Sequence, residues 1–384
     1  MNPTYDVIVL GTGGVGSAAL YHLAARGLRV AGLDQHPPAH GFGSSHGESR
    51  IIRKAYFEHP DYVPLLERAY GLWDHLGQAM DRRDLFERSG LLQIGPADGV
   101  VIPGVLESAA RHGLGLEQLS EAAVSKTFPQ YRLPEGCEAV FEQDAGLLRV
   151  EACVEAHLHL ARTAGAELRT GVVVRHWRAN QRGVTIETSS GVFEAGALII
   201  AAGAWAPELL AGLGIPMEVR RKPLFWLETR SDAHLLNGGC PCFFYERPEG
   251  QFYGFPELSA GEGIKLACHT GGARVADPAR VNRELDEADL SKVQRFAEQW
   301  FPQVGDRLLR HQTCLYTMSP DEHFIVDRHP EHPTVAFAAG LSGHGFKFAS
   351  VLGKILGDLI VEGHTDQPIG FLGLNRFERQ TKPS

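Results

Sequence analysis

Cysteine is scarce in this chain, and the spacing of the cysteines excludes two common uses. Only six occur among 384 residues, at positions 137, 153, 240, 242, 268 and 314. They form no C-x2-C pairs of the kind found in zinc sites, and Cys240 is too close to Cys242 for a relaxed disulfide. We therefore expect reduced thiols, no metal site and a cytoplasmic protein. The first residues also lack the basic segment and cleavage site of a signal peptide.

Two further absences narrow the function. The sequence has no run of about 18 apolar residues, so we expect no membrane-spanning helix. The net charge of −9 argues against a nucleic-acid surface, because phosphate binding needs clustered lysine and arginine. With 43% hydrophobic and 22% charged residues, the composition is typical of a soluble globular protein. The length predicts two domains.

The most specific local pattern is YDVIVLGTGGVGSAALYHLAARGLRVAGLD, near the N-terminus. It predicts two strands, over residues 5–10 and 28–33, with a helix between them. Gly11 permits a tight turn, Gly13 lets a pyrophosphate approach the backbone, and Gly16 lets the helix pack closely on the strand. Asp34 ends the second strand, where an acid accepts ribose hydroxyls. Because no basic residue suited to a 2′-phosphate accompanies this acid, the pattern predicts FAD or NAD and not NADP.

The strands that would complete this sheet are far apart in the sequence. A Gly/Ser/His loop follows Asp34 in place of a third βα unit, and strands return over 166–177 and 183–205. A last strand–turn–helix unit occupies PTVAFAAGLSGHGFKFASVLGKILGDLI. This interleaving favours FAD, because the isoalloxazine needs a second domain as a lid; NAD is the alternative. Alternating strands over 217–268 predict a mostly antiparallel sheet for that lid.

We therefore predict an α/β fold with an α+β substrate domain. A Rossmann-like FAD-binding domain is expected to combine residues 1–85, 145–216 and 320–384. The substrate (catalytic) domain is expected to combine residues 86–144 and 217–319, with domain limits that sequence patterns place only within several residues.

Three short segments carry cations where the nucleotide is expected. In GESRIIRKAY, Arg50 and Arg53 are three residues apart, which we interpret as one face of a helical turn. In IKLACHT, Lys265 and His269 share one face of an expected strand. In LSGHGFKFASVLG, Lys347 lies in the opening turn of an apolar helix, where a cation opposes the macrodipole and indicates a bound anion. Each segment alone also fits an exposed surface. Together they predict positive charge where a flavin ring and an acidic substrate meet.

These segments resemble a known family. VIVLGTGGVGSAA, GSSHGESRIIRKAY, FYGFP, IKLACHT, CLYTMSPDEHFIVD and GLSGHGFKFASVLG are similar to the monomeric sarcosine oxidase and N-methyltryptophan oxidase group of flavoprotein amine oxidases. The resemblance runs along essentially the whole chain. It implies a covalent FAD, bonded to the sulfur of Cys314 in the CLYT segment, whereas the other five cysteines are expected to be inert. Ser49 stands where a threonine is common in relatives.

The resemblance also implies a role for individual residues. Arg53 and Lys347 would bind the substrate carboxylate. Arg50 would support negative charge on the reduced flavin ring, and Lys265 would lie where dioxygen reacts. The remaining residues of the amine-binding region would be His269, Tyr253 and Tyr316. Besides Cys314, the expected cofactor contacts are Gly11, Gly13, Gly14, Gly16, Asp34, Ser44, Ser45, Arg50, Val174, Gly203, Gly343, Gly345, Phe346 and Lys347.

The implied reaction is the oxidative demethylation of sarcosine, or of a related secondary amino acid, by dioxygen. Its products would be glycine, formaldehyde and hydrogen peroxide, and the enzyme is expected to be a monomer. N-methyltryptophan and cyclic imino acids such as pipecolate or proline are alternative substrates. A dehydrogenase with a non-oxygen acceptor and a nucleotide-binding module without turnover are alternative functions. Phe243, Phe244 and Tyr245 are expected near the pocket, where they would either close it for sarcosine or line it for a bulky side chain.

Overall fold

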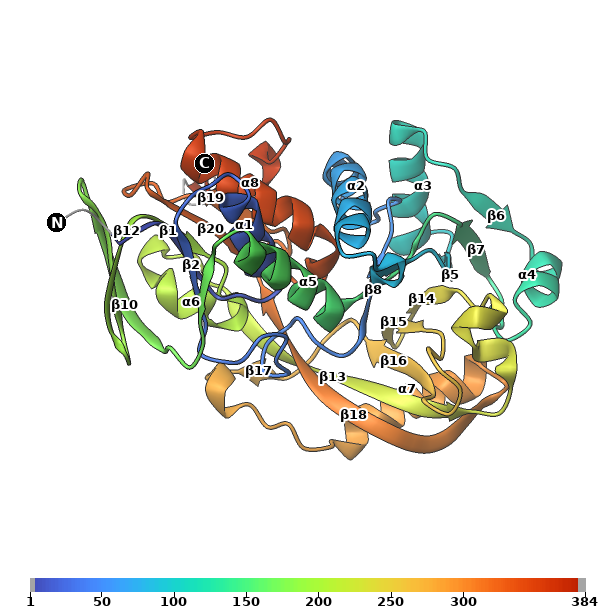
Figure 1. Cartoon of the computed structure of the whole chain (residues 1–384). Helices are drawn as coiled ribbons and strands as arrows, with labels where there is room; N and C mark the ends of the chain where they lie inside the picture. The colour runs from blue at the N-terminus through green and yellow to red at the C-terminus, as the bar shows by residue number, and fades with distance from the viewer. Residues whose placement is uncertain (1–3, 379–384) are drawn as a thin grey trace.

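The described residues form a mixed α/β structure with three β-sheets (Figure 1). The structure is a computed structural model, and it describes residues 4–378. The fold class predicted from the sequence is confirmed. Within this described part of the chain, no helix is both long enough and apolar enough to cross a membrane.

The first sheet contains the dinucleotide-binding pattern. Its strand order is β10-β11-β12-β1-β2-β9, and β20 pairs with both β12 and β19. β1 pairs in parallel with β2 and β12, so segments far apart in the chain lie side by side, as predicted. β1 is apolar along almost its whole length, which a strand buried on both faces requires. The bounds are β1 Tyr5–Leu10, β2 Val30–Leu33, β9 Glu167–Arg169, β10 Val174–Asn180, β11 Gly183–Thr188, β12 Gly191–Ile200, β19 Ile325–Arg328 and β20 Val335–Ala339.

Helices α1 (Gly14–Ala24), α5 (Val150–Thr163) and α8 (Ala349–Val361) lie beside this sheet, where α1 packs against both of the others (Figure 1). α1 follows the glycine loop after β1, and α8 follows the glycine-rich turn after β20. Both helices therefore begin at the carboxyl ends of parallel strands. The 3-10 turn Phe346–Phe348 precedes α8 and places Lys347 at the opening of that helix, as expected.

The second sheet is mostly antiparallel, as predicted from the sequence. Its order is β17-β13-β16-β15-β14-β5-β7-β6, with β18 beside β13, and the exception is the parallel pair β14–β5. The long strands β13 and β18 cross the molecule together (Figure 1). The bounds are β5 Leu91–Pro96, β6 Glu117–Leu119, β7 Cys137–Glu142, β13 Glu218–Thr229, β14 Cys242–Arg247, β15 Gly250–Phe255, β16 Ile264–Cys268, β17 Arg274–Val275 and β18 Val304–Met318.

A small third sheet corrects one expectation. Its antiparallel strands are β3 (Ser49–Ile52), β8 (Gly146–Arg149) and β4 (Phe86–Glu87). We expected Arg50 and Arg53 on one face of a helical turn, and this is wrong, because Arg50 lies inside β3 and Arg53 directly follows it. The two adjacent isoleucines between the arginines favour an extended strand, and β8 supplies its partner.

The remaining α-helices pack against the sheets or against other helices. They are α2 Val63–Ala79, α3 Val101–His112, α4 Glu121–Thr127, α6 Ala206–Leu209, α7 Glu287–Trp300 and α9 Asn375–Glu378. The division of the chain into two domains stays a prediction. Its outermost limits, within residues 1–3 and 379–384, lie outside the described residues.

Candidate active site

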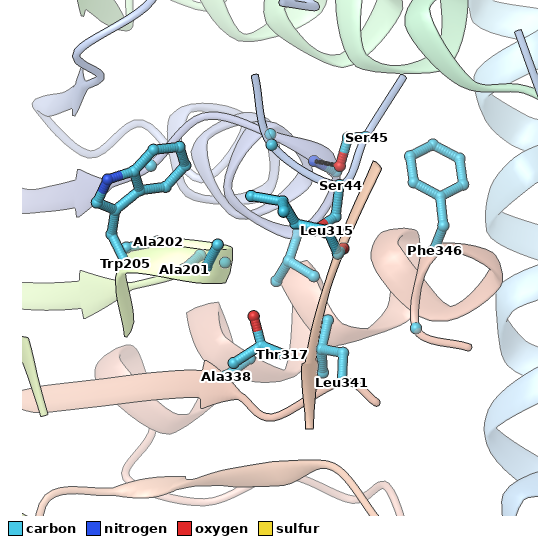
Figure 2. A pocket seen from close by; sticks show the side chains of 18 of the residues that line it. Ser44, Ser45, Ala201, Ala202, Trp205, Leu315, Thr317, Ala338, Leu341 and Phe346 are labelled. Carbon is cyan, nitrogen blue, oxygen red and sulfur yellow. Dashed lines mark hydrogen bonds between the residues drawn. The ribbon is translucent and has the colours of Figure 1, made fainter. Parts of the chain in front are cut away.

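A cavity of about 590 Å³ lies at the carboxyl ends of β1, β12 and β20. In open α/β sheets this is the edge where ligands bind. The wall continues across β18 to Phe244, Tyr253 and His269, so both large sheets contribute to it. Figure 2 shows Ser44, Ser45 and Leu315 around one space, with Trp205 and Phe346 on opposite sides of the view. The volume of the cavity is within the usual range for small-molecule sites.

The glycine loop forms one wall of the cavity with its backbone. Gly11 has a φ of +82°, and a Cβ added there would lie 2.7 Å from the carbonyl oxygen of Ala201. A Cβ on Gly16 would lie 1.8 Å from the carbonyl oxygen of Gly11, so this glycine permits close packing of α1 on β1. Gly13 and Gly14 line the cavity. The amide of Gly14, at the start of α1, donates to Ser45 Oγ at 3.0 Å.

Asp34 lies at the end of β2 and lines the same part of the cavity. Its Oδ2 accepts hydrogen bonds from the Thr12 amide at 2.8 Å and from Thr12 Oγ1 at 3.1 Å. These bonds fix the carboxylate while leaving acceptor capacity for further donors. Thr12 is a site residue that we did not predict; it lies inside the glycine motif at a position that the motif leaves open. Val174 and Gly203 also line the cavity.

Arg50 connects the cavity to Cys314. Arg50 Nη2 donates to Cys314 Sγ at 3.3 Å and to the Ser44 carbonyl at 2.9 Å. Cys314 is only 1% exposed and does not itself line the cavity, whereas Arg50 does. A positively charged neighbour of this kind is found beside reactive cysteines. All six cysteines are free thiols, and this arginine contact distinguishes Cys314 from the other buried ones.

Arg53 and Lys347 both line the cavity, and so does the carboxylate of Glu58. Arg53 Nη2 donates to both carboxylate oxygens of Glu58, at 2.8 and 2.7 Å. Burial opposes ionisation of Glu58, but the surrounding basic groups, first of all Arg53 with its charge and hydrogen bonds, together outweigh it and lower the pKa of Glu58 to about 2. Burial, with the nearby charge of Arg53, lowers the pKa of Lys347 to about 7. We did not predict Glu58, since an acid five residues after an arginine forms no recognisable pattern.

Two tyrosines and a histidine line the wall that the second sheet contributes. The hydroxyls of Tyr253 and Tyr316 are 3.3 Å apart, and Tyr316 Oη lies 3.4 Å from His269 Nδ1. Burial, followed by the charge of Lys222, lowers the pKa of His269 to about 3, so its imidazole is neutral. A Cβ added to Gly343 would lie 2.2 Å from the Tyr316 ring, so the backbone of this turn rests directly on the ring.

Among the aromatic residues of β14, only Phe244 lines the cavity. Phe243 and Tyr245 pack into a separate hydrophobic cluster with Phe296 and Phe301. Successive side chains of a strand point to opposite faces, so the expectation that all three lie near the pocket is wrong for Phe243 and Tyr245.

Lys265 is buried behind β3 and does not line the cavity. Its Nζ donates to the carbonyl oxygens of Gly47 and Ser49, at 2.6 and 2.7 Å, and to Ser49 Oγ at 3.1 Å. Burial lowers the pKa of Lys265 well below its usual value. Lys222, which we did not predict, is also buried and also does not line the cavity. Its Nζ donates to the His269 carbonyl at 2.5 Å and lies 4.9 Å from the centre of the Tyr316 ring.

Residues 6–359 match the model of the family described as FAD dependent oxidoreductase. The chain belongs to this family. It is therefore an FAD-dependent oxidoreductase, and the recognition of a flavoenzyme from the sequence is confirmed. Over 98% of this chain and 99% of the relative, it is 40% identical to the monomeric sarcosine oxidase of Streptomyces avermitilis. It is also 37% identical to an N-methyl-L-tryptophan oxidase of Escherichia coli, over 97% of this oxidoreductase and all of that protein (100%).

Solved structures agree with this family fold. NikD, an unusual amino acid oxidase essential for nikkomycin biosynthesis, has a TM-score of 0.85 and 26% identity over 96% of this oxidoreductase and 97% of that chain. The L-proline dehydrogenase of P. horikoshii has a TM-score of 0.84 over 99% of both chains, and at 21% identity it shows the fold alone.

The cavity of this oxidoreductase fits FAD in three respects. The backbone of the glycine loop, with Asp34 beside it, provides a wall for the dinucleotide. Arg50 lines the cavity and donates a hydrogen bond to the sulfur of Cys314. The turn from Gly343 to Phe346 adds backbone surface at the start of α8, whose N-terminus favours negative charge.

Proposed function

We propose that this oxidoreductase is an oxidase of secondary amino acids and that sarcosine is its substrate. The observation that carries the proposal is a single cavity lined by two buried basic residues, Arg53 and Lys347, and by a neutral group formed by Tyr253, Tyr316 and His269. The cations suit a carboxylate, and the neutral group suits an uncharged amine. The names of the relatives, sarcosine oxidase and N-methyl-L-tryptophan oxidase, support the same substrate class.

The carboxylate of the substrate would bind Arg53 in place of Glu58. Nη2 of Arg53 already donates to both carboxylate oxygens of Glu58, and a guanidinium can donate to the oxygens of another carboxylate as well. Lys347 would supply the second positive charge from the opening turn of α8. Binding therefore exchanges one ion pair for another and fixes the orientation of the substrate.

The amine must be uncharged before its carbon can be oxidised. Burial in the cavity disfavours a charged ammonium, so it favours the neutral amine. The neutral imidazole of His269 and the hydroxyls of Tyr253 and Tyr316 would surround that amine without adding charge. FAD, when bound, supplies the chemistry of accepting two electrons and a hydrogen from the carbon and passing the electrons to dioxygen.

Cys314 would tether the cofactor through its sulfur, and Arg50 would hold that sulfur in place through the hydrogen bond from its Nη2. Lys265, behind β3, would influence the reaction with dioxygen from outside the cavity wall. Acid precipitation tests the tether, since a yellow pellet indicates bonded flavin and a yellow supernatant indicates released flavin. The Cys314→Ser variant should release all of its flavin.

The decisive experiment is a panel of amino acids assayed by peroxide release. The panel should contain sarcosine, N-methyltryptophan, pipecolate and proline, with glycine as the control that lacks the N-methyl group. We expect the highest kcat/KM for sarcosine, with peroxide and formaldehyde formed in equal amounts. Substrate oxidation without peroxide would instead indicate a dehydrogenase. A monomeric state and a cytoplasmic location belong to the same proposal, and size-exclusion chromatography and cell fractionation test them.

A further inference from the structure

Tyr56 lies against both cations of the carboxylate site. Arg53 Cζ is 4.3 Å and Lys347 Nζ is 5.2 Å from the centre of its ring. The ring is fully buried, and Tyr56 does not line the cavity. Since an aromatic face attracts cations, this one ring provides an attractive surface for two charges that repel each other.

The hydroxyl of Tyr56 is held by a histidine whose tautomer the structure determines. Tyr56 Oη lies 2.5 Å from His344 Nδ1, and His344 Nε2 lies 3.0 Å from the carbonyl oxygen of Glu322. A carbonyl can only accept, so Nε2 carries the hydrogen and Nδ1 accepts from the tyrosine. The carbonyl of His344 also accepts from Lys347 Nζ at 2.8 Å. His344 therefore positions both the ring and one of the cations.

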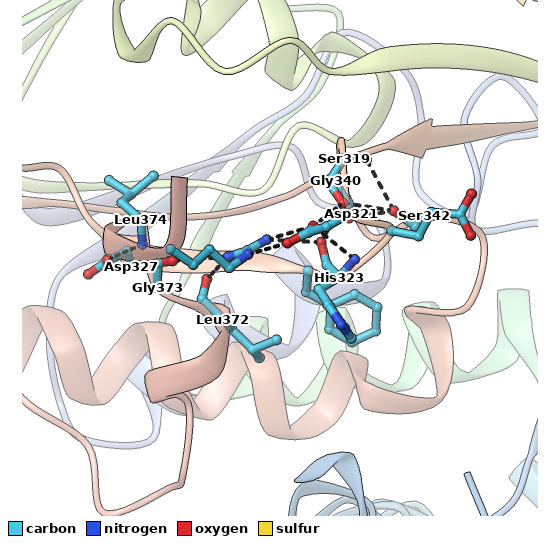
Figure 3. A network of polar contacts seen from close by, with 12 residues as sticks. Ser319, Asp321, His323, Asp327, Gly340, Ser342, Leu372, Gly373 and Leu374 are labelled. Atoms are coloured by element: carbon cyan, nitrogen blue, oxygen red, sulfur yellow. Dashed lines mark hydrogen bonds and ion pairs between the residues drawn. The ribbon is translucent and has the colours of Figure 1, made fainter. Parts of the chain in front are cut away.

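Polar contacts hold the loop that contains Glu322, and Figure 3 shows this network around Asp321 and Ser319. Glu322 has a φ of +62°, an uncommon conformation that its surroundings must maintain. Next to it, Asp321 Oδ2 accepts from Arg376 Nε of α9 at 2.7 Å, and Arg376 Nη1 donates to the Leu372 carbonyl at 2.6 Å. Ser319, at the start of the same loop, donates its amide to Ser342 Oγ at 3.1 Å.

We propose that Tyr56 is a positioning residue for the carboxylate site, and that its bond to His344 ties Arg53 and Lys347 to the loop 319–323, which Arg376 holds. The inference rests on the proposed function for the identity of the bound carboxylate. Losing the hydroxyl would let the ring turn, and the two cations would then lose their common support. The effect should appear in carboxylate binding, while the later chemical step changes little.

Tyr62 provides a matched control. It is as fully buried as Tyr56, and its hydroxyl also lies near a histidine, 3.3 Å from His323 Nδ1. The hydroxyl of Tyr62 also accepts a hydrogen bond from the Phe324 amide at 3.2 Å. Its ring makes no cation contact with Arg53 or Lys347, both of which lie in the described part of the chain. Tyr56→Phe and Tyr62→Phe thus each remove one buried hydroxyl, but only the first removes it from the ring that supports the cations.

The probe is furan-2-carboxylate, which has a carboxylate and no amine to oxidise. Its Kd is measured by titrating the holoenzyme and following the visible spectrum, with calorimetry as an independent readout. We expect Tyr56→Phe to raise this Kd, and the KM for sarcosine, about tenfold, with kcat within about twofold. Tyr62→Phe removes only the contacts of its hydroxyl with His323 and Phe324, so we expect it to change these values by less than about threefold. Equal Kd values in the two variants would overturn the inference.

A second variant reaches the same site from a distance. Arg376→Gln leaves Tyr56 intact and removes the pairing with Asp321, so we expect the Kd of furan-2-carboxylate to rise about threefold, in the same direction as in Tyr56→Phe. An unchanged Kd in Arg376→Gln would overturn the part assigned to the C-terminal segment. The titration needs no turnover. If the unmodified holoenzyme binds the probe but oxidises no amino acid of the panel, the proposed function fails while the variants still decide the inference. If it does not bind the probe, both fail.

Discussion

The ion pair between Arg53 and Glu58 yields the sharpest prediction, because the bound substrate would have to displace it. The usual pKa of 4.5 for Glu58 falls to about 2, a difference worth roughly 3 kcal/mol of folding stability. Because the pKa is lower in the folded protein, this stability is present above pH 4.5 and is lost as the pH falls towards 2. Glu58→Gln removes the charge while keeping the size of the side chain. We therefore expect the variant to lose up to roughly 3 kcal/mol at neutral pH.

The same variant should bind carboxylates more tightly. With Glu58 neutral, Arg53 has no competing anion, so we expect the Kd of furan-2-carboxylate to fall about tenfold. Bound probe should also recover part of the lost stability. Thermal unfolding with and without the probe measures both effects. Glu228→Gln is the control, because its pair with Arg307 at 2.8 Å is exposed and is worth little. Weaker probe binding in Glu58→Gln would refute the view that Glu58 occupies the substrate position on Arg53.

Three further substitutions test other parts of the site. Lys347, with a pKa of about 7, is charged below that pH and neutral above it. The Kd of furan-2-carboxylate should therefore rise as the pH increases through 7. A titration between pH 6 and 9 should show this rise in the native protein and not in Lys347→Met. Gly343→Ala would place a Cβ 2.2 Å from the Tyr316 ring, at a position whose φ is +84°. We therefore expect kcat/KM for sarcosine to fall by about a hundredfold. An unchanged kcat/KM would contradict the placement of this turn. Phe244→Ala should enlarge the cavity and raise kcat/KM for N-methyltryptophan relative to sarcosine, which the peroxide assay reports; a lower ratio would show that Phe244 does not limit substrate size.

Features encoded by contiguous residues could be predicted from the sequence. The glycine loop, Asp34 and the opening of α8 each depend on a few adjacent positions whose geometry is dictated by the backbone. The prediction that Arg50 and Arg53 lie on a helical turn was wrong, because a spacing of three residues does not by itself distinguish a helix from a strand. The preference of Ile51 and Ile52 for extended structure, together with pairing to a strand almost a hundred residues away, decided the outcome.

Other features could not be read from the sequence because distant segments create them. Tyr56 meets His344 across 288 residues of chain, and neither residue type marks a site by itself. Glu58 becomes important only when folding buries it against Arg53. The separation of Phe244 from Phe243 and Tyr245 is different, since strand alternation is present in the sequence and would have placed them on opposite faces.

The most direct test of the proposed function follows the visible absorbance of the holoenzyme mixed with sarcosine, first without oxygen and then in air. The account predicts that the absorbance bleaches without oxygen, returns in air, and releases one peroxide for each sarcosine consumed. Absorbance that sarcosine does not change, or bleaching that air does not reverse, would contradict it.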